Sequence, residues 1–203
     1  VALCGRDLTK ARDVAARWSV PEVCSTTDEL FDRVDAVIVA SSNSSHHAIA
    51  KAALDRGLHV LCEKPLGLNG AEADDLAATA ARTGAITLTP FTYRFMPVFA
   101  ELRHRIDAGF VGRPYHMAAR YYTGYARDGE YAWRFDRAEA GSGVLGDLGS
   151  HWIDLALYLL GPITAVGAVT NNTVPRGPRP DGAPYDTCED VALLTVRFAS
   201  GAI

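Results

Sequence analysis

The regular alternation of short apolar runs with helical segments over residues 1–90 constrains the fold more than any other feature of the sequence. Apolar runs of about four to eight residues are typical of buried strands. Four occur here: VALC (1–4), DAVIVAS (35–41), LHVLCE (58–63) and AITLT (85–89). Because strands separated by helices of about a dozen residues form parallel sheets with right-handed crossovers, residues 1–90 are predicted to be a doubly wound α/β domain.

Helix-capping residues support this division. The capping-box spacing occurs twice, at Thr26–Glu29 and at Asn69–Glu72. Between them, Ser44 or Ser45 is predicted to cap a helix that ends at Gly57. The run TKARDVAARW (9–18) is also amphipathic, so at least one helix is predicted after each of the first three strands.

The pattern changes after Pro90. Helices are expected at 97–108 and 147–160, strands at 115–122, 164–170 and 190–198, and a long Pro/Gly-rich loop at 173–186. Residues 91–203 are therefore predicted to be a separate α+β domain with a mainly antiparallel open sheet.

Composition excludes several classes of function. The formal net charge is −4 and there is no basic stripe, so nucleic acid is not an expected partner. No apolar run approaches the ~20 residues that span a bilayer. The four cysteines are widely spaced, which indicates reduced thiols of a cytoplasmic protein and no metal site. Because Val1 already lies in a strand-like run, we expect an internal fragment, which leaves any N-terminal targeting signal undetermined.

Polar residues gather at three predicted strand ends, in CGRD (4–7), ASSNSSHH (40–47) and CEKP (62–65). The carboxyl ends of parallel strands lie at one edge of a sheet, where ligands bind. Ser41, Ser42 and Asn43 could contact a phosphate, ribose or nicotinamide, or could simply cap a helix. His46 could line the same edge, whereas His47 is expected at the surface.

Lys64 is the most unusual of these residues. Pro65 restricts the residue before it to extended geometry, so Lys64 has a fixed backbone at the end of a buried strand. The alternative is a surface ion pair, for example with Glu63.

A second polar group lies in GSGVLGDLGSHWIDLALYLLG (141–161). Asp147, His151 and Asp154 have the i, i+4, i+7 spacing of one helix face. Asp147 could instead be an N-cap, and His151 a core histidine. GSGVLG (141–146) matches the dinucleotide fingerprint G-x-G-x-x-G, but WRFDRAEA precedes it instead of an apolar strand, so we do not expect it to bind dinucleotide.

Four segments resemble, in order, the motifs of the glucose–fructose oxidoreductase / inositol dehydrogenase / MocA (Gfo/Idh/MocA) family. These are SSNSSHHAIAKAALDRGLHV (41–60), CEKPLGLNGAEADDL (62–76) with the E-K-P signature, TYRFMPVFAELRHRIDAGFVGRP (92–114), and the 141–161 segment with a D-x-G-x-H motif. The resemblance implies a nicotinamide-dependent oxidoreductase with an N-terminal Rossmann domain, here without its first strand and glycine-rich loop, and a C-terminal domain, here truncated, whose sheet often mediates homo-oligomerisation.

The resemblance also implies roles for individual residues. Lys64, Asp147 and His151 match the catalytic positions. Ser41, Ser42, Asn43, His46, Glu63 and Lys64 match cofactor contacts, and Tyr93, Arg94, Trp133 and Arg134 stand near the substrate pocket. The implied reaction is hydride transfer between NAD(P) and a CH–OH group of a sugar or polyol. The alternatives are an NAD-dependent glycosidase of the same family and a non-catalytic nucleotide sensor or regulator.

The cofactor preference is argued from the first strand end. NAD-specific sites usually place an acid at the end of the second Rossmann strand. Gly5 and Arg6 stand there instead, and an arginine can pair with a 2′-phosphate. NADP is therefore favoured, with NAD as the alternative if Asp7 is the ribose ligand.

Overall fold

The computed structural model describes all 203 residues and divides them into two compact units, Val1–Pro90 (unit 1) and Phe91–Ile203 (unit 2). The parallel strands of unit 1 and the antiparallel strands of unit 2 confirm the predicted fold class. No helix combines the length and apolar character needed to cross a bilayer.

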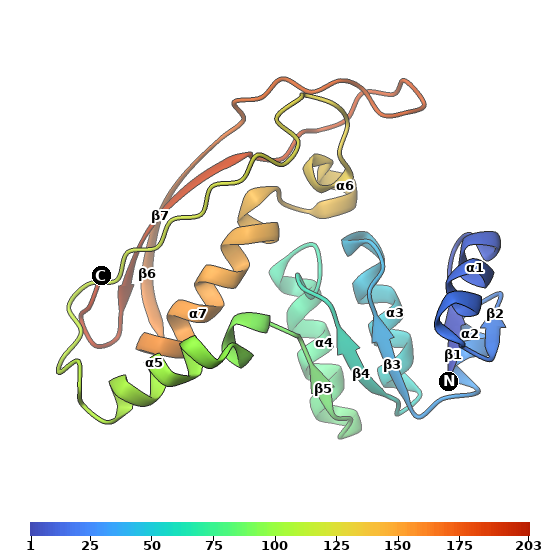
Figure 1. Ribbon diagram of the computed structural model, residues 1–203, viewed down its shortest axis with the longest axis horizontal. Coiled ribbons are helices and arrows are strands. Elements are labelled where there is room, and N and C mark those ends of the chain that lie inside the picture. Colours follow the sequence, from blue (N-terminus) through green and yellow to red (C-terminus); the bar gives the residue numbers. More distant parts are fainter. The chain divides into compact units, whose positions relative to one another are not determined.

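All strands of unit 1 pair in parallel (Figure 1). One sheet joins β1 (Ala2–Cys4) to β2 (Glu22–Cys24), and a second has the order β3 (Ala36–Val39), β4 (His59–Cys62), β5 (Thr87–Leu88). The helices are α1 (Leu8–Trp18), α2 (Thr27–Phe31), α3 (Asn43–Asp55) and α4 (Gly70–Thr83). Strand β2 was not predicted, because it follows Pro21 and begins with Glu22, so no apolar run marks it.

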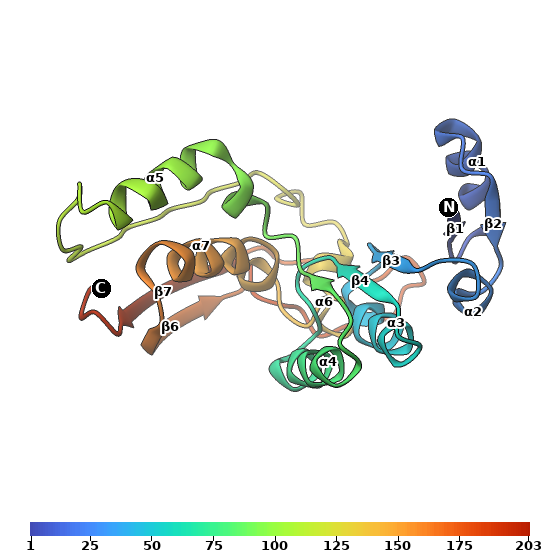
Figure 2. The same ribbon diagram turned by 90° about the horizontal axis from the view of Figure 1, so that it is seen from below.

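Helices α3 and α4 pack side by side on one face of the β3–β4–β5 sheet (Figure 2). The core between them consists of Phe31, Val37, Val39, Ala50, Ala53, Leu54, Val60, Cys62 and Leu76. The alternation of buried Val37 and Val39 with exposed Ala36 and Ile38 shows that this face of β3 carries the core.

The capping predictions are partly confirmed. Glu29 N–H donates to Thr26 Oγ1 at 3.2 Å, and Glu72 N–H donates to Asn69 Oδ1 at 3.0 Å. The prediction for α3 was wrong by two residues, because the helix begins at Asn43 with Ser42 at the cap position. Its run of four polar residues allows several cap positions, and packing selects one of them.

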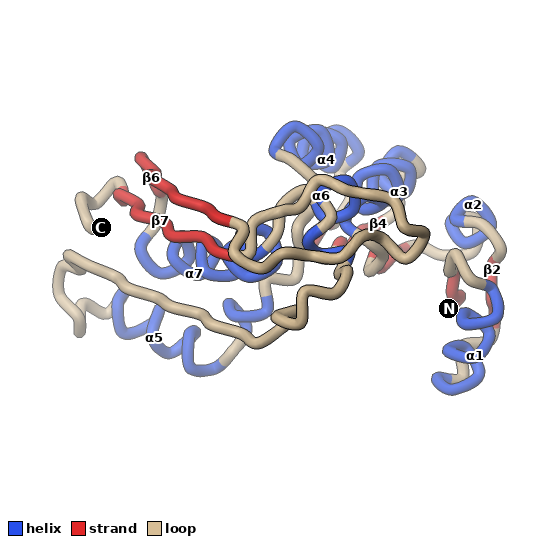
Figure 3. Tube along the Cα trace, turned by 90° about the horizontal axis from the view of Figure 1, so that it is seen from above, coloured by secondary structure: helices blue, strands red, loops and turns tan.

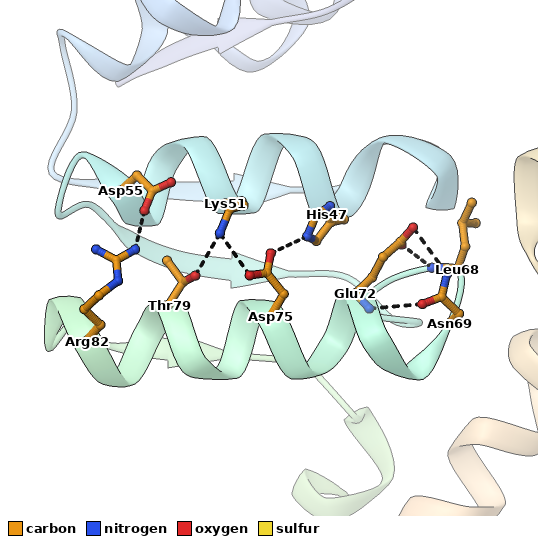
Figure 4. Close-up of polar contacts among 9 residues, drawn as sticks. All are labelled: His47, Lys51, Asp55, Leu68, Asn69, Glu72, Asp75, Thr79 and Arg82. Atoms are coloured by element: carbon orange, nitrogen blue, oxygen red, sulfur yellow. Dashed lines mark hydrogen bonds and ion pairs between the residues drawn. The ribbon is translucent and has the colours of Figure 1, made fainter.

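A polar network joins the facing sides of α3 and α4 (Figure 4). The carboxylate of Asp75 accepts hydrogen bonds from His47 Nε2 at 2.7 Å and Lys51 Nζ at 3.1 Å. Lys51 also donates to Thr79 Oγ1 at 3.1 Å. The network lies over the apolar core and fixes the register of the two helices.

Unit 2 is built around a long antiparallel pair, β6 (Ile163–Asn171) and β7 (Val191–Phe198). Its helices are α5 (Pro97–Asp107), α6 (Arg137–Ala140) and α7 (Ser150–Leu160), with a π-helical turn at Leu145–Gly149 directly before α7. Short 3-10 turns lie at Thr92–Phe95 and Trp133–Phe135.

The strand predicted at 115–122 is wrong. Residues 115–122 are loop (Figure 3). Two backbone hydrogen bonds join it to Ile203, from Met117 N–H to Ile203 O at 2.9 Å and from Ile203 N–H to Tyr115 O at 3.1 Å. Both bonds involve the single residue Ile203, so no strand ladder forms.

The Pro/Gly-rich loop between β6 and β7 is anchored by ion pairs of Arg176 with Asp190 and of Arg179 with Asp136. The carboxylate of Asp136 is fully buried and receives two hydrogen bonds from Arg179, at 2.6 and 2.9 Å. Tyr131 Oη donates to the same carboxylate at 3.3 Å. These bonds hold the pKa of Asp136 below its usual value, with the Arg179 bonds as the main cause.

Candidate functional site

In unit 1, the polar residues of two strand ends come together at one edge of the sheet. Strands β3 and β4 are in register, with Val39 opposite Cys62, and Glu63 N–H donates to Val39 O at 2.9 Å. Residues 41–43 and 63–64 therefore leave the sheet side by side, as predicted for two of the three polar strand ends. The third, after β1, belongs to the separate β1–β2 sheet, so the predicted common edge of all three is not formed.

The 41–45 segment presents hydroxyl groups at the start of α3. Ser41 Oγ lies 2.6 Å from Ser45 Oγ, and Ser42 Oγ lies 3.3 Å from Ser44 Oγ. Ser42 occupies the cap position without a side-chain cap bond. The first turn of this 13-residue helix therefore has the positive dipole end and the hydroxyl groups that suit a phosphate or an amide carbonyl.

Lys64 and Glu63 are both partly buried. The Glu63 carboxylate accepts a hydrogen bond from the backbone N–H of Lys64 at 3.1 Å, and the Lys64–Pro65 peptide bond is cis. The acid thus contacts the lysine's main chain.

His46 is almost entirely buried, with 1% of its surface exposed. Nδ1 lies 2.8 Å from Pro65 O, and Nε2 lies 3.1 Å from Ser41 O. Both ring nitrogens are occupied by main-chain carbonyls, one from each strand end. This arrangement was not predicted, because a sequence does not show which atoms surround a buried ring.

At the end of β1, the side chains of Arg6 and Asp7 differ in their contacts. The Asp7 carboxylate caps α1, accepting from Thr9 N–H at 3.0 Å and Lys10 N–H at 3.1 Å. Arg6 is exposed and takes part in no ion pair. The arginine is the side chain at this position that remains available for a ligand.

Unit 2 contains a cavity of about 520 Å³. Its wall includes Tyr125, Arg134, Phe135, Asp147, Arg176 and Asp190. Arg134 Nε lies 3.4 Å from Asp147 Oδ2, and its guanidinium stacks over the Trp133 ring at 4.5 Å. Of the residues predicted from the sequence, Arg134 and Asp147 thus lie on this wall, and Arg134 contacts both Asp147 and Trp133.

His151 lies on α7 within an aromatic group. Its ring centroid is 5.1 Å from that of Tyr93 and 6.0 Å from that of Phe91. Tyr93 also contacts Trp152, with ring centroids 5.5 Å apart. Tyr93 and His151 were predicted separately, and α7 and the Thr92–Phe95 turn bring them into contact.

The predicted common face of Asp147, His151 and Asp154 is not formed as expected. Asp147 lies in the π-helical turn, which changes its angular spacing from the residues that follow. Asp154 is buried and receives two hydrogen bonds from Arg94 Nε, at 2.7 and 2.9 Å, and one from Nη2 at 2.7 Å. Arg94, predicted near the substrate pocket, is engaged by this carboxylate, whose bonds raise the pKa of the guanidinium further.

The sequence analysis missed two residues that shape the cavity. Glu189 Oε1 accepts from Gly143 N–H at 2.8 Å and Leu145 N–H at 3.1 Å, which fixes the turn before Asp147. The side chain of Arg176 is 2% exposed; it lies 3.6 Å above the Phe135 ring and donates to Ala126 O at 2.9 Å. The acidic pair Glu189–Asp190 before a strand could have pointed to Glu189. Nothing in the sequence marked Arg176.

Comparisons with known proteins match both units. Residues 1–91 match the sequence profile described as "Oxidoreductase family, NAD-binding Rossmann fold", and residues 99–203 match the "GFO/IDH/MocA C-terminal domain". Similar proteins include levoglucosan dehydrogenase of Pseudarthrobacter phenanthrenivorans (31% identical, covering 95% of this chain and 54% of that protein). D-glucoside 3-dehydrogenase of Escherichia coli is 31% identical, covering 100% of this chain and 60% of that protein.

Solved structures agree with the sequence matches. A complex of levoglucosan dehydrogenase with NADH and levoglucosan superimposes with a TM-score of 0.92 at 30% identity, covering 99% of this chain and 55% of that one. An oxidoreductase domain protein from Kribbella flavida has a TM-score of 0.91 at 36% identity, covering 99% and 56%. The chain thus spans little more than half the length of these relatives. Because both of its units match the family's two domains in order, the chain belongs to the Gfo/Idh/MocA oxidoreductase family.

Proposed function

We propose that the protein containing these 203 residues is an NAD(P)-dependent oxidoreductase acting on a CH–OH group of a sugar or polyol. Residues 1–90 bind the cofactor, and residues 91–203 bind the substrate and join copies of the protein through the β6–β7 sheet. The names of its relatives, which include dehydrogenases of levoglucosan, glucosides and scyllo-inositol, support this class of substrate.

The observation that carries the proposal is the cavity of unit 2. A volume of about 520 Å³ is in the range of small-molecule sites and leaves room for a monosaccharide. Its wall combines the paired charges of Arg134 and Asp147 with the rings of Tyr125 and Phe135. A sugar needs both, because its hydroxyl groups are polar and the C–H faces of its ring are apolar. Asp147 and Arg134 bind sugar hydroxyls in this proposal.

Oxidation of an alcohol also requires removal of the hydroxyl proton. His151 is proposed as the general base that accepts this proton, oriented by its contact with Tyr93. The Lys64 ammonium hydrogen-bonds the substrate oxygen and stabilises its developing charge. The nicotinamide, when bound, supplies the hydride-accepting chemistry.

The strand-end residues of unit 1 fit a dinucleotide. Ser41, Ser42 and Asn43 lie at the N-terminus of α3, and Glu63 and Lys64 leave the neighbouring strand beside them. We propose NADP as the preferred cofactor, because Arg6 is available for a 2′-phosphate while the Asp7 carboxylate is committed to capping α1.

The test is a screen of sugars, inositols and trans-dihydrodiols with the full-length protein and both cofactors, following formation of reduced nicotinamide. On the substrate found, Lys64→Ala should lower kcat about 100-fold or more, the usual effect of removing a group that stabilises the developing oxyanion. Lys51→Ala is the matched control, because Lys51 contacts Asp75 and Thr79 on α4 and should leave kcat unchanged. Unchanged turnover in Lys64→Ala would refute the mechanism.

The same screen tests the cofactor preference. Arg6→Ala should raise KM for NADP by about 10-fold or more, the loss expected for a charge-assisted hydrogen bond, and leave KM for NAD nearly unchanged. Equal changes for the two cofactors would refute the assignment of Arg6.

A further inference from the structure

We propose that His46 is a positioning residue that holds the Lys64–Pro65 segment against the end of β3. The inference rests on the proposed function, because it assigns Lys64 a role in the reaction. It concerns only unit 1, where every contact it uses lies.

The geometry differs from that of an ordinary core histidine. The ring is buried, and its two nitrogens face two carbonyl oxygens, Pro65 O at 2.8 Å and Ser41 O at 3.1 Å. Carbonyl oxygens only accept hydrogen bonds, so a neutral ring with one N–H donates to one of them, whereas a ring with both N–H groups donates to both. The shorter distance makes Pro65 the principal acceptor.

Pro65 O belongs to the residue directly after Lys64. On the other side, the Lys64 main chain is held by the Glu63 carboxylate at 3.1 Å, and Glu63 N–H bonds to Val39 O at 2.9 Å. His46 thus adds a hydrogen bond on the C-terminal side of Lys64 to the two bonds on its N-terminal side. The backbone of Lys64 is held from both directions, and both anchors lead to the β3 end.

This arrangement matters for a reaction that depends on the placement of an ammonium group. A displacement of about 1 Å at a reacting group can cost on the order of 100-fold in rate. Loss of the His46 bond frees Pro65 O, and the segment that carries Lys64 loses one of its anchors. The expected effect is on kcat more than on KM for the sugar.

The neighbouring histidine provides a matched control. His47 Nε2 lies 2.7 Å from Asp75 Oδ2 on α4, and its bonds do not reach either strand end. His46→Ala and His47→Ala each remove one imidazole and its hydrogen bonding from α3. Both should lower thermal stability, but only the first should change kcat.

The experiment compares His46→Ala, His46→Asn, His46→Gln and His47→Ala in the full-length protein. His46→Ala should lower kcat about 10- to 100-fold. The Asn amide nitrogen stands near the position of Nδ1 and that of Gln near Nε2, so Asn should recover more of kcat than Gln. Asn also keeps a hydrogen-bond donor in the buried site. If His46→Ala does not fold, the comparison of kcat between His46→Asn and His46→Gln therefore still tests the proposal.

Hydrogen–deuterium exchange supplies a readout that does not depend on turnover. The amides of Lys64, Leu66, Gly67 and Leu68 should exchange faster in His46→Ala than in wild type, and be unchanged in His47→Ala. If no substrate is turned over, the proposed function fails while this exchange result still decides the role of His46. Equal effects of the two alanine variants on kcat, or unchanged exchange of these four amides in His46→Ala, would overturn the proposal.

Discussion

Glu189 shows how one buried side chain can determine the shape of a site several residues away. Its carboxylate and its main-chain carbonyl accept from three consecutive N–H groups, those of Gly143, Val144 and Leu145. A Cβ on Gly143 would overlap Glu189 O, so only glycine allows the approach. The first two glycines of GSGVLG therefore serve packing and turn formation. No strand precedes this segment, which agrees with that role.

Removing the Glu189 carboxylate should destabilise unit 2. Glu189→Ala leaves one buried and one partly buried N–H group without this acceptor. A buried group left unpaired costs about 1–3 kcal/mol, so we expect a loss of about 2 kcal/mol in the free energy of unfolding. Glu189→Gln keeps an acceptor oxygen and should lose less. Urea unfolding measures both. Glu101→Ala, which breaks an exposed i, i+4 pair with Arg105, should change stability by less than about 1 kcal/mol; an equal loss there would contradict the prediction.

At the scale of residues, the sequence identifies a functional side chain only where its type is unusual for its place in the pattern. Lys64, Asp147 and His151 stand out because their types are unusual for their places in the pattern. Glu189 and Arg176 could not be identified, because their role depends on which backbone groups a distant segment brings to them. Asp154 was assigned to an open face from helical spacing alone, and Arg94 contacts it from 60 residues away.

At the scale of elements, α3 and α4 depend on a shared carboxylate. The pKa of Asp75 is lowered, first by its hydrogen bond from His47 and then by that from Lys51 (Figure 4). A depressed carboxylate pKa stabilises the folded state at pH values above the unfolded pKa of about 4, and the stabilisation is lost as the pH falls below it.

Asp75→Asn should therefore lower the melting temperature at neutral pH, and its difference from wild type should shrink as the pH falls from about 5 to 3. Asp74→Asn is the control, because the adjacent Asp74 is exposed and makes no ion pair. Thermal melts across this pH range measure the effect. A wild-type advantage that did not shrink between pH 5 and pH 3 would mean that the Asp75 charge does not stabilise the helix pair.

Elements with strong local signals were predicted well, and those that depend on a partner were not. Helices α1 and α4 and strands β3, β4, β6 and β7 follow from periodicity and caps. Segment 115–122 has a strand pattern but only two backbone hydrogen bonds, both to Ile203, and β2 is formed by three residues that pair with β1. Strand formation depends on the neighbouring strand as much as on the pattern itself.

At the scale of the whole molecule, each unit has its own buried thiol. Cys62 lies in the core of unit 1 and Cys188 is fully buried in unit 2. Burial raises the pKa of each thiol to about 11, and the charge of Glu63 adds to the effect at Cys62. Because the thiolate is the reactive form, both side chains should resist alkylation near neutral pH while their unit is folded.

The two thiols should therefore report separately on the two units. In a urea series with iodoacetamide and residue-level mass spectrometry, alkylation of each cysteine should rise as its own unit unfolds. Asp75→Asn should lower the urea midpoint for Cys62 and leave that for Cys188 in place, whereas Glu189→Ala should do the reverse. These outcomes follow if each unit is held by its own core and polar network, since distant, unconnected substitutions act independently. A common shift of both midpoints in either variant would instead show that the two units unfold as one cooperative structure.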